Sequence, residues 1–306
     1  MSAPQIRLLE PGDEALLEAF LLPRIESSMF LLGNMQTAGL VDKGIGQQGT
    51  YVAAIETNEQ GDAQITAVVS HYANGNLIPQ APVHLDELWR AAVRISGREV
   101  RGAVGPADQV QAIIASLSAD VGGIHPNNVQ MDYTEYLYRL DLNDLIVPDL
   151  LTSGQVQGRR GNMGDIDVLV PWRVAYNMEA LGVEDTPDVW EHCQQSVERY
   201  LQIQRSWVLE RKGDGVTELV ATTNFNTAIP QAVQVGGVWT PPELRSRGYA
   251  RAVVAASLLD ARDEGASLGV LFTDRENVAA QKSYESLGFA RVGDYCLFGL
   301  KKGYAL

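Results

Sequence analysis

Residues 233–250 read VQVGGVWTPPELRSRGYA, and this stretch decides the fold of the chain around it. Its first half is apolar and β-branched, which predicts a strand over 232–240. The proline pair at 241–242 ends that strand, because proline cannot donate to a strand ladder. Over 248–264 apolar residues recur with the helical period, which predicts a helix entered through a loop that contains glycine.

The loop itself, residues 245–250, is a candidate anion site. A helix that begins after such a loop leaves several backbone N–H groups without partners, all near the positive end of the helix dipole. Arg245, Arg247 and Arg251 lie in or next to the loop. They make phosphate the expected anion, because guanidinium groups match phosphate oxygens.

Length and composition indicate a globular chain. Its 306 residues, 45% hydrophobic and 20% charged, suffice for one large domain or two of about 150 residues. Apolar runs stay below the roughly 18 residues of a membrane helix, and the N-terminus lacks a signal pattern. We therefore expect a cytoplasmic protein with no membrane partner. Cys193 and Cys296 and the four histidines lack ligand spacing, which predicts neither a disulfide nor a metal site.

Charge differs between the halves of the chain. The net charge of −14 disfavours a nucleic-acid partner, which would need a basic surface. Residues 1–150 hold 8 basic and 19 acidic residues, whereas residues 151–306 hold 16 and 19. A polyphosphate ligand is therefore expected in the second half. An acidic cleft would favour a cationic acceptor.

Periodicity predicts the same order of elements twice. A segment rich in Gly, Ser, Gln and Pro at 148–160 marks a boundary, so we expect domains at 1–150 and 161–306. Expected in the first half are strands at 5–9, 50–55, 64–71, 77–78, 100–104 and 135–142, and helices at about 12–22, 28–38, 84–95 and 107–117. Expected in the second half are strands at 166–170, 206–210, 216–224, 232–240, 270–273 and 290–300, and helices at 171–181, 185–204, 248–264 and 276–287.

A second motif follows the anion loop. Residues 277–289 read NVAAQKSYESLGF. Asn277 and Tyr284 are two helical turns apart and would share one face. Gly288 is suited to the left-handed residue that ends a helix, with Phe289 as the apolar contact of a Schellman motif.

These two motifs resemble the GCN5-related N-acetyltransferase (GNAT) superfamily, whose loop reads Gln/Arg-x-x-Gly-x-Gly/Ala and whose later helix has an Asn…Ala…Tyr…Leu-Gly-Phe pattern. The resemblance implies an α/β (α+β) fold with two GNAT-like domains, each a mixed, mainly antiparallel central sheet flanked by helices. It further implies that acetyl-CoA is the cosubstrate, that the loop amides hold its pyrophosphate and that the strand end runs beside its pantetheine arm. The implied cofactor-binding residues are Val238, Trp239, Thr240, Arg245, Ser246, Arg247, Gly248, Tyr249, Ala250 and Asn277.

The same resemblance implies that Tyr284 protonates the departing thiolate. On physical grounds Gly236 and Gly237 should weaken or bulge the strand before the loop. As general base the first candidate is Glu218, ahead of Glu210 and Asp274. A water chain in place of any of these side chains is the other possibility.

The first half departs from the pattern. Residues 74–82, where its loop should occur, contain no basic residue and no matching glycine pattern. We expect this half to have the fold without a coenzyme site and to contribute substrate walls or packing surface. It is similar in this respect to tandem proteins with one degenerate half, such as glycine N-acyltransferase-like and mycothiol synthase-like proteins.

The expected function is N-acetyl transfer from acetyl-CoA to a small-molecule or peptide primary amine, by direct attack in a ternary complex, by a monomer or homodimer. The alternative is a coenzyme-A-binding regulatory or scaffold protein without turnover. A dinucleotide-dependent oxidoreductase is disfavoured, because no GxGxxG motif follows an early strand.

Overall fold

The computed structural model describes residues 4–58, 60–213 and 216–306. The chain forms two compact units. Unit 1 comprises Met1–Leu137, Phe272–Glu276 and Arg291–Leu306. Unit 2 comprises Tyr138–Leu271 and Asn277–Ala290. Each unit thus draws on separate parts of the chain, whereas the sequence predicted two consecutive segments, 1–150 and 161–306.

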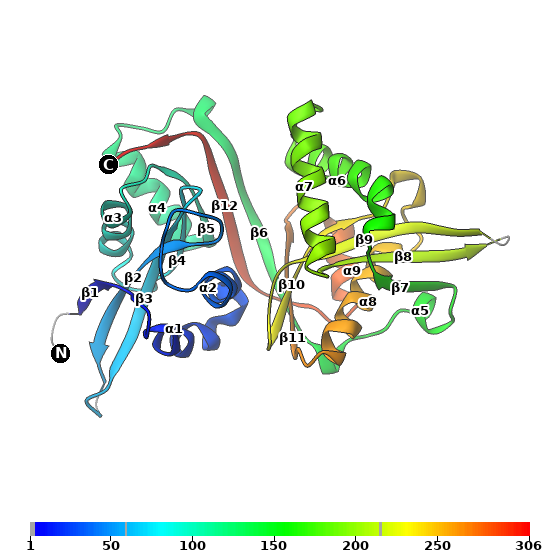
Figure 1. Ribbon diagram of the computed structural model, residues 1–306, viewed down its shortest axis with the longest axis horizontal. Helices are drawn as coiled ribbons and strands as arrows, with labels where there is room; N and C mark the ends of the chain where they lie inside the picture. The colour runs from blue at the N-terminus through cyan, green and yellow to red at the C-terminus, as the bar shows by residue number, and fades with distance from the viewer. Residues whose placement is uncertain (1–3, 59, 214–215) are drawn as a thin grey trace. The chain divides into compact units, whose positions relative to one another are not determined.

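Unit 1 is a sheet with helices on both faces (Figure 1). Its strands pair in the order β1-β2-β3-β4-β5-β12, antiparallel except for the parallel pair β4 and β5. The strands are β1 Gln5–Leu8, β2 Gly49–Thr57, β3 Ala63–Tyr72, β4 Asn76–Gln80, β5 Val100–Pro106 and most of β12 Ala290–Tyr304. The helices are α1 Glu14–Leu21, α2 Ile25–Ala38, α3 Leu85–Ser96 and α4 Ala107–Asp120. Strand β6, Val129–Asp141, begins in unit 1 and ends in unit 2.

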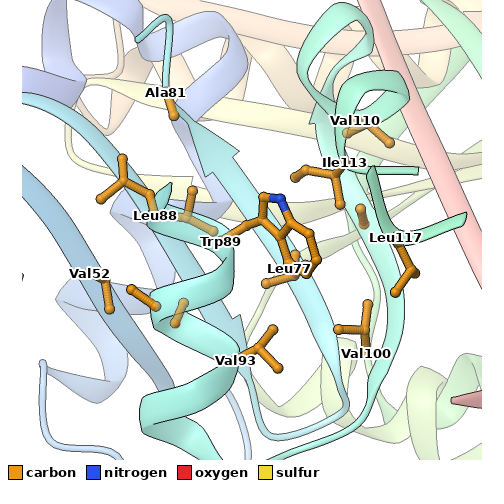
Figure 2. Packing of buried hydrophobic residues seen from close by; sticks show 14 of the residues in the cluster. Val52, Leu77, Ala81, Leu88, Trp89, Val93, Val100, Val110, Ile113 and Leu117 are labelled. Atoms are coloured by element: carbon orange, nitrogen blue, oxygen red, sulfur yellow. The ribbon is translucent and has the colours of Figure 1, made fainter. Parts of the chain in front are cut away.

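Alternate residues of a strand face opposite sides of the unit 1 sheet. Val52 faces α3 and α4, where Leu88 and Trp89 of α3 and Ile113 of α4 are all buried in one apolar cluster (Figure 2). Its neighbour Tyr51 points the other way, and the Tyr51 hydroxyl donates to the Leu31 backbone oxygen in α2. The two helix pairs therefore cover opposite faces of this sheet.

Unit 2 has the same build. Its strands pair in the order β11-β10-β9-β8-β7, with β10 and β11 parallel and the others antiparallel. The strands are β7 Val156–Arg160, β8 Ser206–Gly213, β9 Val216–Ile229, β10 Ala232–Trp239 and β11 Leu268–Asp274, whose last residues belong to unit 1. The helices are α5 Asp149–Thr152, α6 Ile166–Leu181, α7 Pro187–Gln202, α8 Tyr249–Asp263 and α9 Val278–Glu285.

Two neighbouring residues of β8 define the faces of unit 2. Val208 packs with buried residues of α6 and α7. Trp207 points the other way, and its indole Nε1 donates to Asp260 of α8 over 2.9 Å. Helices α6 and α7 therefore cover one face and α8 the other (Figure 1).

The structure corrects two expected elements. The strand expected at 166–170 is the start of α6, because Asn162 and Asp165 form a capping box on a 3₁₀ turn, Met163–Asp165, that continues directly into α6 before Pro171. The helix expected at 28–38 begins earlier, at Ile25, because the 3₁₀ turn Leu22–Arg24, which contains Pro23 and follows the end of α1, leads directly into α2.

Both units are mixed, mainly antiparallel sheets flanked by helices, which confirms the α+β class that the sequence predicted. None of the described helices has the length and apolar character needed to cross a membrane.

Candidate active site

Strand β10 bulges at its glycine pair. Gly236 lies opposite Asn224 and Trp239 lies opposite Thr222, so β10 contains one more residue than β9 over this interval. Gly237 has a φ of +56°, and a Cβ there would lie 2.1 Å from the Asn224 Oδ1 atom. Glycine is needed for this approach, and the predicted weakening of the strand is confirmed as a bulge.

The loop after β10 begins α8 through left-handed residues. Ser246 has a φ of +62°, and Gly248, the N-cap residue of α8, has a φ of +80°. No group in the described part of the chain accepts a hydrogen bond from the backbone N–H of residues 246–251. These N–H groups surround the positive end of the helix dipole, which is the arrangement that binds anions.

Arg245 has a structural role in this loop. Its Nη2 lies 2.8 Å from Glu179 Oε2, and its Nε donates to the Thr240 backbone oxygen over 3.1 Å. Its guanidinium carbon also lies 4.9 Å from the centre of the Trp239 ring. The side chain therefore ties the loop to β10 and α6, whereas the sequence suggested a phosphate ligand.

The other two arginines are better placed for an anion. Arg247 and Arg251 are exposed, and among the described residues neither has a carboxylate partner. A Cβ on Gly248 would lie 3.2 Å from Arg251 Nε, so this guanidinium lies against the loop backbone. Two cations thus flank the unpaired N–H groups.

The end of β10 holds unpaired polar atoms. Trp239 and Thr240 are buried, with exposed fractions of 6% and 8%. Neither the Trp239 indole Nε1 nor the Thr240 hydroxyl has a hydrogen-bond partner among the described residues. Burying such atoms without partners is costly, so a ligand that pairs with them would be stabilised here. Val238, beside them, is half-buried.

Helix α9 ends as the sequence predicted. The Phe289 N–H donates to the Tyr284 oxygen and the Gly288 N–H donates to the Glu285 oxygen, which is the Schellman pattern. Gly288 has a φ of +101°, and the Tyr284 and Phe289 rings lie 6.2 Å apart, edge to face. These contacts hold the buried Tyr284 ring in place.

Asn277 lies one residue before α9, so it does not share a helical face with Tyr284 as the spacing suggested. Its Oδ1 accepts from the Ala280 N–H over 3.1 Å and caps the helix. Its amide nitrogen is left to donate to a ligand.

Glu218 lies on the α8 face of unit 2. It is opposite Arg211, and its Oε2 lies 2.5 Å from the Arg211 Nη2 atom. The Arg211 Nη1 in turn donates to the Tyr249 hydroxyl of α8 over 3.3 Å. This ion pair gives the Glu218 carboxylate a structural partner, and its role as a base stays a prediction. Glu210 is likewise paired, with its Oε1 2.6 Å from Arg159 Nε.

A cavity that the sequence did not predict lies on the opposite face, between α6, α7 and the strands β8 to β10. Its wall includes Arg173, Tyr176, Tyr200, Asn224 and the bulge residue Gly237. Periodicity placed residues 171–181 of α6 in a helix, but no sequence signal indicated that one of them faces a strand bulge.

Residues 175–289 match the family model described as the acetyltransferase (GNAT) family. The chain carries a GNAT domain. No curated protein matched it in a sequence search.

Two solved structures share the fold over nearly the whole chain, and a third has a weaker similarity. A Drosophila protein superposes with a TM-score of 0.64 at 14% identity, over 96% of this chain and 98% of its own. A GCN5-related glucosamine N-acetyltransferase region of a fungal multi-domain β-N-acetylglucosaminidase gives a TM-score of 0.52 at 14% identity, over 97% of this chain and 38% of that one. A GNAT-family acetyltransferase from Colwellia psychrerythraea covers 97% of this chain and 100% of its own, with a TM-score of 0.48 at 14% identity. At such identities the similarity shows the fold alone.

Unit 1 has a different residue at the start of the helix that corresponds to α8 of the GNAT domain. His84, with a φ of +56°, is the N-cap residue of α3, where α8 has Gly248. The first turn of α3 carries Asp86 and Glu87, whereas the first turn of α8 has no acidic residue. The negative charges of these carboxylates offset the positive end of the α3 dipole, which disfavours a phosphate there.

Proposed function

We propose that the GNAT domain transfers an acetyl group from acetyl-CoA to a primary amine of a small molecule or peptide, by direct attack within a ternary complex. We further propose that unit 1 has no coenzyme site, which the acidic first turn of α3 supports.

The run of unpaired backbone N–H groups at 246–251 is the observation that carries this proposal. A pyrophosphate would accept hydrogen bonds from these N–H groups at the helix start. Arg247 and Arg251 would balance its charge, since neither is neutralised by a carboxylate of the described residues.

The end of β10 fits the next part of the same ligand. The pantetheine arm contains amide groups, which need both donors and acceptors. The main chain of Val238, Trp239 and Thr240 would run beside that arm, and the unpaired Trp239 indole and Thr240 hydroxyl could bond to it. Asn277 would contribute its Nδ2 group, because its Oδ1 caps α9.

Tyr284 would act as the general acid. A phenol carries a proton at neutral pH and can donate it to a leaving sulfur. In the reaction the amine nitrogen bonds to the thioester carbonyl carbon as the carbon–sulfur bond breaks. The proton that the nitrogen loses passes to solvent or a base, and Tyr284 supplies the proton that the thiolate gains.

For the base we retain Glu218 as a testable candidate beside water. Glu218 forms an ion pair with Arg211 on the face of the sheet away from the cavity, so a water molecule is the favoured base. Glu218→Gln should therefore leave the pH dependence of kcat/KM unchanged, and a loss of the acid limb in that variant would restore Glu218 as the base.

Ligand-dependent melting tests the coenzyme site. CoA and acetyl-CoA should raise the melting temperature, because a ligand that binds only the folded state stabilises it by RT ln(1 + [L]/Kd). NADH is the matched dinucleotide control and should have no effect. A shift with NADH and none with CoA would refute the site.

Tyr284→Phe tests the chemistry. We expect kcat to fall by about 100-fold or more with little change in acetyl-CoA affinity, since the hydroxyl acts mainly as the thiolate leaves. Release of free thiol with a panel of amines measures this. Tyr138→Phe is a matched control, because the Tyr138 hydroxyl bonds to Glu285 of α9 over 3.1 Å and its loss leaves the Tyr284 hydroxyl in place.

Equal turnover of the Tyr284→Phe variant and the natural protein would remove Tyr284 from the mechanism. CoA binding with no turnover for any amine would instead favour the coenzyme-A-binding regulatory protein.

A further inference from the structure

The cavity of unit 2 lies beside the bulge of β10. Its volume is about 30 Å³, and Gly237 of the bulge forms part of its wall together with Asn224 of β9 and Arg173 of α6. By this measure a water molecule needs roughly 10–15 Å³. The cavity therefore holds about two water-sized groups, the size of the two oxygens of a carboxylate.

Arg173 is the one charged residue among those that line this cavity. Its Nε atom is buried without a hydrogen-bond partner, and no carboxylate of the described residues forms an ion pair with its guanidinium. The guanidinium lies instead over the Tyr176 ring, with its carbon 5.3 Å from the ring centre. A partly buried cation without an anion is costly, so this site favours a ligand that carries the missing negative charge.

The bulge holds the guanidinium close to the strand. A Cβ on Gly237 would lie 2.8 Å from the Arg173 Nη1 atom, so glycine allows the side chain to approach the backbone. Gly237 directly precedes Val238, where the proposed pantetheine segment begins. An anion bound by Arg173 would thus be held next to the reacting end of the coenzyme.

Neutral polar groups complete the wall. The Asn224 Nδ2 atom donates to Asn226 Oδ1 over 2.9 Å, and the Tyr200 hydroxyl donates to the same oxygen over 3.4 Å. Ser206 and Thr222 add hydroxyl groups to the lining. The Tyr200 and Thr222 hydroxyl protons are donated to Asn226 Oδ1 and to the Trp207 backbone oxygen. The second Nδ2 hydrogen of Asn224 and the Ser206 hydroxyl are therefore the neutral groups that can donate to a carboxylate. None of the lining residues is acidic, so the wall offers no partner to a cationic group.

We propose that the acceptor is a small amino acid whose carboxylate is bound by Arg173 in this cavity, while its amine faces the acyl donor. This rests on the proposed acetyl transfer to a primary amine. It also reverses the expectation of a cationic acceptor that the net charge had suggested, because the charge of the cavity lining is positive.

A panel of small amino acids tests this, each assayed with acetyl-CoA against its own carboxamide and its decarboxylated amine. Each amino acid with a free carboxylate should have a kcat/KM at least about 10-fold higher than its carboxamide or its decarboxylated amine. Arg173→Gln should raise their KM by about 10- to 100-fold and abolish the preference, with Kd for CoA unchanged. Arg173→Lys should recover part of the loss, because it restores the charge without the planar fork.

The matched control is Arg199→Gln, which removes an exposed arginine of α7 that does not line the cavity. It should leave the preference unchanged. Melting temperatures of all variants report whether they fold. Equal turnover of charged and uncharged amines by the natural protein, or a preference that survives in Arg173→Gln, would overturn the assignment while acetyl transfer stands.

Calorimetric titration of the same amino acids into the CoA-loaded protein separates this inference from the proposed function. If no amine is acetylated, the transferase proposal fails. Amino-acid binding that is lost in Arg173→Gln would still support the carboxylate site, and absence of binding to the natural protein would refute it.

Discussion

Replacing Gly248 with alanine should damage both the stability of the chain and its coenzyme site. Gly248 has a φ of +80°, a left-handed conformation that costs a residue with a Cβ about 1–2 kcal/mol. The new Cβ would also lie 3.1 Å from the Leu150 Cδ1 atom and 3.2 Å from Arg251 Nε, so both neighbours must move by a few tenths of an ångström. We expect the free energy of unfolding to fall by about 1–2 kcal/mol.

The effect on binding has a separate origin. The displaced backbone carries the unpaired N–H groups at 246–251, and Arg251 lies against it. A hydrogen bond to a charged group contributes about 1.5–3 kcal/mol. Loss of one such bond to the pyrophosphate should therefore raise Kd for CoA by about 10- to 150-fold.

Gly265→Ala is the matched control. Gly265 follows the other end of α8, has a φ of +104°, and a Cβ there would meet no atom within 4 Å. This variant should lose similar stability in urea denaturation but bind CoA normally in calorimetric titration. Equal Kd values for the two variants would refute the coenzyme site at Gly248.

Three further predictions concern unit 1. Burial lowers the pKa of His71 to about 4, so the unfolded chain takes up its proton first. The contribution of His71 to stability should fall by about 3 kcal/mol as pH drops from 6.5 to 4, and His71→Asn should remove this contribution in urea denaturation. Burial, and then the charge of Asp274, raise the pKa of Glu135 to about 7 from 4.5, so the folded state binds this proton more tightly. Its contribution, also about 3 kcal/mol, should be lost as pH rises from 4.5 to 7, which opposes the His71 contribution where the two ranges overlap. Of these two, Glu135→Gln should therefore leave only the His71 contribution, so that stability rises with pH in this range; a pH dependence equal to that of the natural protein would contradict the assignment. Leu88→Ala should cost about 2–5 kcal/mol, measured by the same denaturation, because Leu88 is fully buried in the α3 cluster.

Local signals predicted the best-defined parts of the GNAT domain. Gly288 ends α9 in a Schellman motif as the sequence predicted, and Thr186 caps α7 with Pro187 as its first residue. Such signals depend on residues within one helical turn, so they can be recognised without knowledge of distant contacts.

The start of α6 was predicted wrongly although its signal is local. The segment 166–170 is apolar and β-branched, which predicted a strand, yet a capping box on the 3₁₀ turn Met163–Asp165 leads directly into the helix. The binding of phosphate by Arg245 stays a prediction, and the ion pair of its guanidinium with Glu179 of α6 is a contact that only the folded chain shows.

One extra residue in β9 determines which face of the sheet the Glu218 side chain lies on. The pairing of β8 with β9 shifts between Leu209 and Glu210, so β9 contains an extra residue near Val220. Strict alternation would place Glu218 on the same face as Thr222, which lines the cavity. The bulge turns Glu218 toward α8 instead.

The sequence by itself determined the strand, glycine loop and helix around residues 233–250, because backbone preferences and periodicity are local properties. Only the tertiary structure decided which polar groups are left without partners. Trp239, Thr240 and Arg173 have unpaired buried atoms, and this depends on packing between segments far apart in the chain. The anion loop was therefore visible in the sequence, while the cavity beside it required the folded chain.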